Sequence, residues 1–181
     1  RGLRVIEFNC RFGDPETQVV LPRLSTDFLP VLEACVQGRL DTVTLEWDSQ
    51  ACVGVVMASE GYPAEYKTGF PITGLDQLAD GIRVFHGGTA SQPMRGNSGL
   101  RRLWATDLPG TTVAEQLSGE IQTAGGRVLT VVAMGQTVEE ARQRVYQNIN
   151  YIRFEGAFYR RDIGIPSPAA AMLQSSDLGA L

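Results

Sequence analysis

The chain has 181 residues, 43% of them hydrophobic, which is enough to bury one core of ordinary size. The formal net charge is −4 and no cluster of cations could follow a phosphate backbone, so nucleic acid is not expected as a partner. A membrane is not expected either, because no apolar run approaches the roughly 20 residues that cross a bilayer and residues 1–9 do not resemble a signal peptide.

The first predicted element is a strand over residues 4–9, with the sequence RVIEFN. Side chains alternate between the two faces of a strand, so three apolar residues share one face: Ile6, Phe8 and Cys10. The other face carries a carboxylate, an amide and a guanidinium: Glu7, Asn9 and Arg11. The strand therefore presents three polar side chains in one direction.

Two helices are predicted to follow this strand. In the first, Asp14 occupies an N-cap position, Pro15 the first helical position and Glu16 the first turn. Pro22 should kink or end that helix. A second helix, ending at Gly38, is predicted from the helical spacing of five apolar residues: Phe28, Leu29, Leu32, Cys35 and Val36.

From about residue 41 the pattern changes to strands and turns. β-Branched and apolar stretches predict strands at Thr42–Trp47, Ala51–Ala58 and Ile82–His86. Residues 61–71 and 91–99 have the composition of loops. Residues 100–124 leave loop and short strands open as alternatives.

The clearest unit is a strand followed by a helix. Residues 127–134 are apolar enough to be buried on both faces of a sheet. Thr137 and Glu140 then form a T-x-x-E capping box. The apolar stripe of the helix is predicted at Val138, Ala141, Val145, Ile149 and Ile152. The remaining residues to 165 predict a turn and an extended stretch, and residues 166–181 a flexible tail.

Two further patterns exclude classes of site. Cys10, Cys35 and Cys52 lie 25 and 17 positions apart without a CxxC pair, which predicts free thiols in a reducing cytosol rather than a zinc site or a disulfide framework. The basic residues are 15 arginines and the single Lys67, which is expected to be a solvated loop residue. Neither a Walker loop nor a dinucleotide-binding fingerprint is present.

Chemistry is predicted on the first strand. Side chains two residues apart on a strand are spaced by about 6.6–7 Å and share a face. The oxygens of Glu7 and Asn9 are hard ligands suited to magnesium or manganese, and the Arg11 guanidinium can bind a phosphate through two nitrogens. Taken alone, however, an E-x-N-x-R pattern fits a solvent-facing strand edge better.

Residues 7–18, EFNCRFGDPETQ, closely resemble the signature of the phosphoribosylamine–glycine ligases, or glycinamide ribonucleotide synthetases, of the ATP-grasp superfamily. Further blocks of resemblance follow in family order at Tyr62-Pro63, Val84–Thr89, Gly125–Leu129, Phe154–Gly156 and Tyr159–Gly164. The RFGDPETQ run is highly specific, whereas the E-x-N pair occurs across the superfamily.

The resemblance implies an α+β fold. Residues 1–40 would end an ATP-grasp core with its metal-binding strand and the helices that follow. Residues 41–165 would form a β-rich C-terminal domain with one capped helix, and residues 166–181 a tail. A complete enzyme of this family carries its N-terminal and ATP-binding lobes before the metal-binding strand, so those lobes are expected as the missing partners of this segment.

The resemblance also implies a reaction in the cytoplasm, a step of purine biosynthesis. ATP, glycine and 5-phosphoribosylamine would give glycinamide ribonucleotide, ADP and phosphate through a glycyl phosphate. Glu7 and Asn9 match the family's ligands for magnesium or manganese, and Arg11 matches the catalytic arginine that steadies phosphate charge. The segment alone is expected to be inactive, because it lacks the lobes that position ATP.

Several residues are candidates for binding the other substrates. Asp14 and Glu16 are close enough in sequence to hold glycine or the amine, although helix capping explains both equally well. The ribose phosphate could be bound by Arg127, Arg160, Arg161 and Asp162, with an arginine–aspartate surface pair as the alternative. His86 could be a base or a ligand, but a structural role at the end of a strand is the simpler interpretation.

Two other functions remain open from the sequence. A different ATP-grasp enzyme, such as a carboxylase, would share the E-x-N-x-R geometry. A non-catalytic interaction module that pairs with a separate chain would carry the same folding pattern without the reaction.

Overall fold

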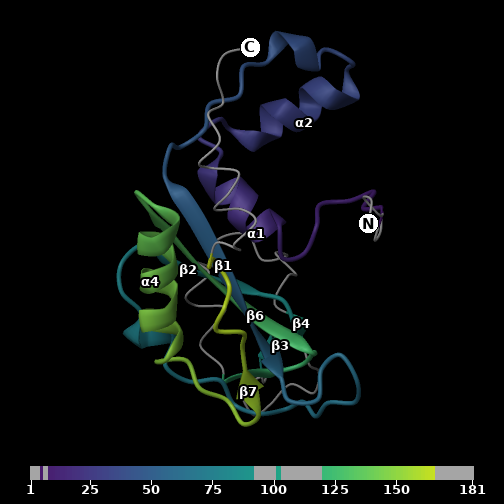
Figure 1. Cartoon of the computed structure of the whole chain (residues 1–181). Coiled ribbons are helices and arrows are strands. Elements are labelled where there is room, and N and C mark those ends of the chain that lie inside the picture. Colours follow the sequence, from purple (N-terminus) through teal and green to yellow (C-terminus); the bar gives the residue numbers. More distant parts are fainter. Residues whose placement is uncertain (1–4, 6–7, 92–100, 103–119, 166–181) are drawn as a thin grey trace.

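The centre of the molecule is a four-stranded antiparallel sheet in the order β2-β6-β1-β7 (Figure 1). The computed structural model describes residues 5, 8–91, 101–102 and 120–165. The sheet strands are β1 (Ala51–Ser59), β2 (Ile82–His86), β6 (Arg127–Gly135) and β7 (Ala157–Phe158). The predictions of strands at 51–58, 82–86 and 127–134 are therefore confirmed.

One helix covers one face of this sheet. Helix α4 (Val138–Ile149) begins after Thr137, whose side chain accepts a hydrogen bond from the Glu140 backbone nitrogen. Its buried stripe packs on alternate residues of β1 and β6, and the resulting core contains Val53, Val55, Met57, Leu129, Val131, Ala133, Ala141, Val145 and Ile149. Val138, predicted on the same stripe, is instead exposed at the start of the helix.

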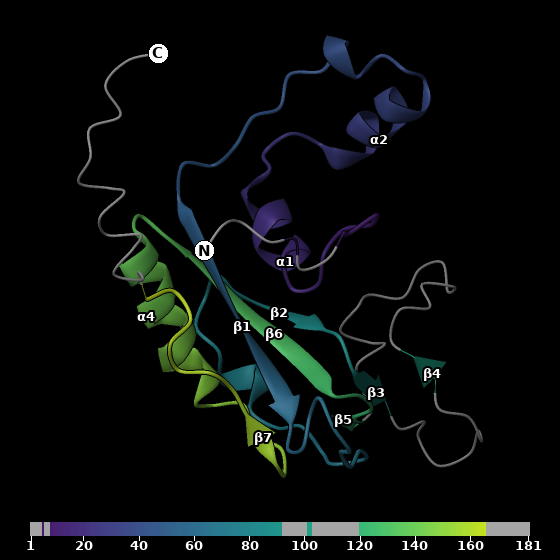
Figure 2. The same cartoon turned by 45° about the vertical axis from the view of Figure 1, so that its right-hand side comes forward.

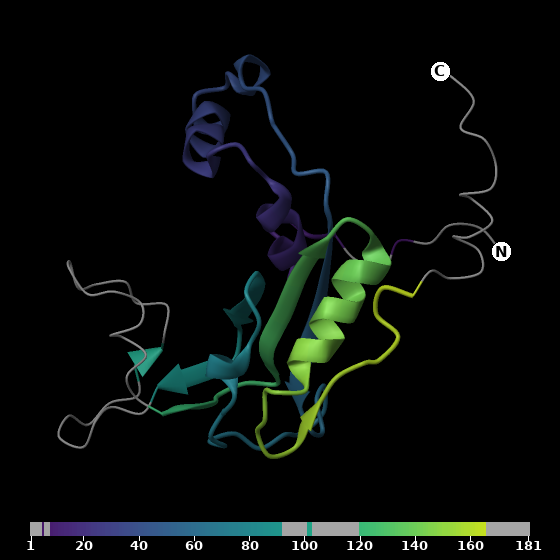
Figure 3. The same cartoon turned by 90° about the vertical axis from the view of Figure 1, so that its left-hand side faces the viewer.

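The opposite face of the sheet contacts a short helical segment, as Figure 3 shows. This segment consists of α1 (Thr17–Val20) and the 3-10 turn η1 (Leu21–Arg23). Gly54 of β1 lies beneath it, and a methyl group on Gly54 would come within 2.7 Å of Val19 Cγ1. The absence of a side chain at Gly54 therefore lets α1 approach the strand backbone.

The first helix begins later than its sequence predicted. Residues 14–16 form a turn with a cis Asp14-Pro15 peptide bond, and α1 starts only at Thr17. The Asp14 carboxylate accepts a hydrogen bond from the Gln18 side chain instead of capping a backbone nitrogen. The predicted N-cap at Asp14 and first helical position at Pro15 are therefore wrong, because Asp14 is engaged by other side chains.

The second predicted helix is present as α2 (Phe28–Val36), capped by the Asp27 side chain, which accepts a hydrogen bond from the Leu29 backbone nitrogen. Its apolar stripe does not face the sheet. Val36 is 90% exposed and Leu29 62%, whereas Val31 is 7% exposed. Most of the residues that predicted the helix thus remain uncovered within the described part of the chain.

Two of the predicted strands, at residues 42–47 and 4–9, are not found among the described strands. Residues 42–47 contain the end of η2 (Leu40–Thr42) and a single bridge between Trp47 and Leu24, because no strand of the described chain pairs along this stretch. In the stretch 4–9, the described residues Val5, Phe8 and Asn9 are outside any strand, and the others lie outside the described residues. A β-strand needs a paired neighbour, and neither stretch has one among the described strands.

A small second sheet lies beside the first, in the order β4-β3-β5 (Figure 2). Its strands are β3 (Thr89–Ser91), β4 (Arg101–Arg102) and β5 (Ile121–Thr123). The loop predicted at 61–71 is confirmed, and a 3-10 turn, η3 (Leu75–Gln77), follows it. The predicted loop at 91–99 and tail at 166–181 fall, apart from Ser91, outside the described residues.

Within the described residues, no helix has both the length and the apolar character to cross a membrane. All three cysteines are free thiols, two exposed and one half-buried.

Candidate functional site

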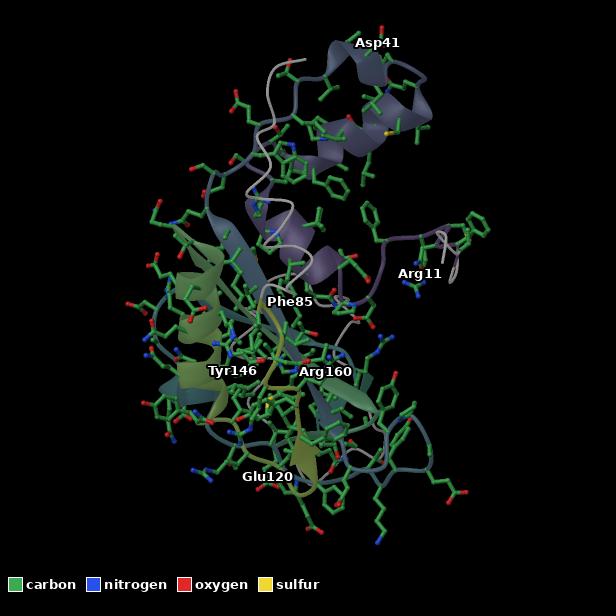
Figure 4. All side chains as sticks on the ribbon, viewed as in Figure 1. Arg11, Asp41, Phe85, Glu120, Tyr146 and Arg160 are labelled. Atoms are coloured by element: carbon green, nitrogen blue, oxygen red, sulfur yellow. The ribbon has the colours of Figure 1, made fainter. Side chains whose placement is uncertain are left out.

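A cavity of about 370 Å³ lies where the segment before α1 meets the end of β2. It is lined by Phe12, Gly13, Asp14, Thr17, Gln18, Leu21, Phe85 and His86. Figure 4 marks Phe85 just below α1. Parts of two sequence blocks singled out above, within residues 12–18 and 85–86, therefore form two walls of one cavity.

An ion pair between distant parts of the chain holds the cavity wall around Asp14 in place. Arg127, the first residue of β6, places Nη2 3.0 Å from Asp14 Oδ2. Its Nη1 donates a hydrogen bond of 2.9 Å to the Asp14 backbone oxygen. A guanidinium that binds both the carboxylate and the main chain fixes a segment better than a single charge contact does.

The wall around Asp14 is a small hydrogen-bonded network. Gln18 Nε2 donates to Asp14 Oδ1 at 3.0 Å, and the Thr17 backbone nitrogen donates to the Gly13 oxygen at 3.0 Å. The Glu16 carboxylate folds back over Gly13, where its Oε2 would clash with an added Cβ. Both predicted substrate-binding carboxylates, Asp14 and Glu16, thus belong to one short turn.

The opposite wall contains the only histidine of the chain. His86 Nδ1 lies 3.0 Å from the hydroxyl oxygen of Thr89, which is buried. Packing around the ring lowers the pKa of His86 below its usual value, because burial disfavours the charged imidazolium. The ring is therefore neutral at pH 7 and has one nitrogen able to accept a proton.

The turn after His86 packs tightly against the start of β6. The backbone nitrogens of Gly87 and Gly88 both donate to the Val128 oxygen at 3.0 Å. A Cβ on Gly88 would meet the Arg127 oxygen at 2.6 Å and the Gly125 Cα at 2.8 Å. Only glycine at position 88 allows this approach, which sets the distance between the turn and Arg127.

Among the described residues predicted to bind metal and phosphate, neither Asn9 nor Arg11 lines this cavity. Glu7 is outside the described residues, and Asn9 and Arg11 are exposed on the preceding segment. Arg11 Nη1 donates to the Phe12 oxygen at 2.7 Å, and Figure 4 shows Arg11 on the segment that leads away from α1. Among the described residues, no group of three or more His, Cys, Asp and Glu side chains is arranged to hold a metal ion.

Arg161 is not brought to the cavity. Its guanidinium lies 5.8 Å from the centre of the Tyr159 ring, and its backbone oxygen accepts a hydrogen bond from Arg142 of α4. Because α4 covers the face of the sheet opposite α1, Arg161 and Asp14 lie on different sides of the molecule. Among the arginines predicted to bind the ribose phosphate, Arg127 contacts Asp14 in the cavity wall, whereas Arg161 does not line the cavity.

A second cavity, of about 460 Å³, lies between the end of β1 and the loop after it. Charged and aromatic residues line it, including Glu60, Glu65, Tyr66, Lys67, Phe70 and Glu155. None of the predicted site residues lines this cavity. We therefore take the cavity at Asp14 and His86 as the candidate site.

Sequence reasoning identified Asp14 and Glu16 but gave little weight to His86 and none to Thr17, Gln18 and Phe85. The signal that could have found them was their place inside two blocks of family resemblance. Their proximity was not visible, because no local pattern relates residues 12–21 to residues 85–86.

Comparison with known proteins agrees with the blocks of resemblance. Residues 52–166 match the family described as "Phosphoribosylglycinamide synthetase, C domain". The chain is 43% identical over 162 residues to the phosphoribosylamine–glycine ligase of Caldanaerobacter subterraneus, covering 90% of this chain and 33% of that protein. It is also 43% identical over 163 residues to the ligase of Escherichia coli, covering 89% of this chain and 32% of the other.

A solved structure is similar as well. The crystal structure of phosphoribosylamine–glycine ligase from Thermotoga maritima superposes with a TM-score of 0.63 at 30% sequence identity. The match covers 87% of this chain and 32% of that structure. The chain thus spans about a third of the length of the relatives it matches.

Proposed function

Because the chain belongs to the phosphoribosylglycinamide synthetase family, we propose that it forms the C-terminal part of a phosphoribosylamine–glycine ligase. The whole enzyme would use ATP to join glycine to 5-phosphoribosylamine through a glycyl phosphate, as a step of purine biosynthesis in the cytoplasm. One observation carries the proposal: the two blocks at residues 7–18 and 84–89 meet at one cavity, fastened by the Arg127–Asp14 ion pair.

The cavity offers groups suited to an amine substrate. The Asp14 carboxylate, which lines the cavity, can attract an ammonium group, as can the carboxylate of Glu16 in the same turn. A neutral imidazole such as His86 can take up a proton. In amide formation the amine nitrogen bonds to the carbonyl carbon, phosphate leaves, and the amine loses a proton. We propose that His86 lies on the wall facing that amine and that Asp14 and Glu16 orient it.

The metal and phosphate site is proposed for the segment before the cavity. Glu7 and Asn9 supply a carboxylate and an amide oxygen, the hard ligands that fit magnesium or manganese. A bound ion of this kind neutralises the charge of ATP phosphates. Arg11, exposed two residues beyond Asn9, would add its guanidinium to the same phosphates.

The ATP-binding groups themselves are proposed to lie in the part of the enzyme that the chain does not span. Residues 1–40 would complete the ATP-grasp core and residues 41–165 would form the C-terminal domain, a division supported by the start of the family match at residue 52. The exposed apolar stripe of α2 is consistent with this division, since a core segment would be covered by the rest of the core.

The test uses the full-length protein that contains this chain. We expect ADP release that requires both glycine and 5-phosphoribosylamine, and a loss of about 100-fold or more in Glu7→Gln together with altered metal dependence. Glu155→Gln, an exposed carboxylate at the other cavity, is the matched control and should keep the rate.

Two results would contradict the proposal. ADP release that needs bicarbonate instead of glycine would identify a carboxylase. Unchanged rate and metal dependence in Glu7→Gln would remove Glu7 from the metal site.

A further inference from the structure

Arg127 contacts both walls of the candidate site, one with its side chain and the other with its backbone. The guanidinium binds the Asp14 carboxylate at 3.0 Å and the Asp14 backbone oxygen at 2.9 Å. The Arg127 backbone oxygen lies against Gly88, in the turn that follows His86. A single residue therefore connects the segment before α1 to the turn after β2.

The other hydrogen bonds of the segment held by Arg127 lie mainly within that segment. Asp14 bonds to Gln18, Thr17 bonds to Gly13, and the backbone nitrogens of Val19 and Val20 donate to the Glu16 oxygen. These contacts stabilise the turn internally but do not set its place relative to His86. That place depends on Val19 over Gly54 at one end and on the Arg127–Asp14 pair at the other.

The contacts that Arg127 already makes argue against a direct role in binding the substrate phosphate. Both terminal nitrogens of its guanidinium already bind Asp14, so a substrate phosphate would have to displace a charged and a neutral contact to reach them. Arg127 binds Asp14, which lines the cavity, and Glu16 follows in the same turn; both are proposed above to orient the amine. Arg127 is thus placed to hold these groups instead of touching the substrate.

We propose that Arg127 is a positioning residue, which holds the Asp14–Glu16 turn at the correct distance from His86. The inference rests on the proposed ligase function and deepens it, since it assigns to Arg127 an indirect role in binding the amine substrate. A direct role in binding the ribose phosphate is the competing interpretation. The two interpretations predict different losses of activity when the Arg127 and Asp14 substitutions are combined.

The experiment compares Arg127→Gln, Asp14→Asn and the double variant in the full-length protein. A misplaced turn should lower kcat/KM by about 10- to 100-fold in Arg127→Gln, and the double variant should lose no more than the larger single loss. Arg127→Lys keeps the charge but cannot make both contacts, so it should recover only part of the rate. Glu139→Gln removes a surface ion pair, with Arg142, on helix α4 at the other face of the sheet and should keep the wild-type rate.

Hydrogen exchange supplies a readout that does not depend on activity. The amides of Thr17, Val19 and Val20 are hydrogen-bonded in the turn and in α1, and they should exchange faster in Arg127→Gln and in Arg127→Lys but not in Glu139→Gln. Unchanged exchange in Arg127→Gln would overturn the inference. Losses that multiply in the double variant would also overturn it, in favour of direct phosphate binding.

The two proposals can fail separately. If the wild-type protein shows no turnover that needs glycine, the ligase function fails, and the exchange result alone decides whether Arg127 holds the turn.

Discussion

Val19 of α1 lies directly over Gly54 of β1, so close that a methyl group on Gly54 would come within 2.7 Å of Val19 Cγ1. The neighbouring methyl groups of Val132 and Thr130 would lie at 3.3 and 3.4 Å from the same position. Through this contact the helical segment of α1 and η1 packs on the face of the sheet that α4 does not cover.

The first prediction concerns this contact. Gly54→Ala should lower the free energy of unfolding by about 1–3 kcal/mol, because the added methyl group overpacks the site beneath α1. Urea unfolding of the chain measures the change. Adding Val19→Ala should restore part of the loss, since the smaller side chain makes room. A Gly54→Ala variant with unchanged stability would show that α1 moves away from β1 without cost.

The second prediction concerns pH. The pKa of His86 is lowered in the folded chain, so between its usual value of 6.5 and the lower folded value the unfolded chain binds more protons. Stability contributed by the neutral ring is thus present above pH 6.5 and is lost as pH falls through this window. His86→Gln should remove that part of the pH dependence. Urea unfolding at pH 7.5 and 5.5 measures it, and the absence of other histidines keeps the comparison simple.

A third prediction concerns the segment after α4. Arg142 donates to the Ile163 oxygen and to the Arg161 oxygen, each at 3.1 Å, and stacks on Tyr146 at 4.9 Å. Arg142→Ala should therefore expose residues 159–165 to faster hydrogen exchange and cost about 1–2 kcal/mol. Glu139→Ala removes only the exposed ion-pair partner of Arg142, at 3.6 Å, and should leave this exchange unchanged.

A fourth prediction compares two valines of one helix. Val31 is 7% exposed and Val36 is 90% exposed, although both lie in α2. Val31→Ala should cost about 1–2 kcal/mol in the free energy of unfolding, whereas Val36→Ala should stay within about 0.5 kcal/mol. Equal losses in urea unfolding would mean that Val36 is covered in solution, for example by a second copy of the chain.

The last prediction concerns the chain by itself. Purified residues 1–181 should not form glycinamide ribonucleotide from ATP, glycine and 5-phosphoribosylamine at a measurable rate. Positioning of the reactants contributes roughly 7–11 kcal/mol to lowering such a barrier, and the groups that hold ATP are proposed to lie elsewhere in the enzyme. Product measured above a protein-free control would contradict this expectation.

The central strands were predictable from sequence because the apolar composition of each segment indicates that it is buried. Residues 128–134 are apolar except for Thr130, and β6 is indeed buried on both faces. The stretch 42–47 has similar β-branched character but lacks a paired strand, so it is not a strand. Composition indicates which segments can be buried, and pairing decides which of them become strands.

The candidate site was predictable only in part. Family resemblance indicated Asp14, Glu16 and Arg127, but local reasoning assigned Asp14 to a helix cap. The contact that decides the role of Asp14 comes from Arg127, 113 residues further along the chain. Local capping rules consider only neighbours in sequence, so they could not anticipate this competitor for the carboxylate. The predicted metal and phosphate roles of Glu7, Asn9 and Arg11 remain predictions.

The backbones of Gly88 and Gly125 touch, and a Cβ added to either one would lie within 3.0 Å of the other's Cα. The HGGT motif at residues 86–89 and the GGRVL motif at residues 125–129 are separate in the sequence, yet one steric constraint applies to both. Enlarging both glycines at once would worsen the clash, so compensating substitutions of the kind seen in cores are not open to this pair. Anyone transplanting the site into another scaffold would have to move the two motifs together.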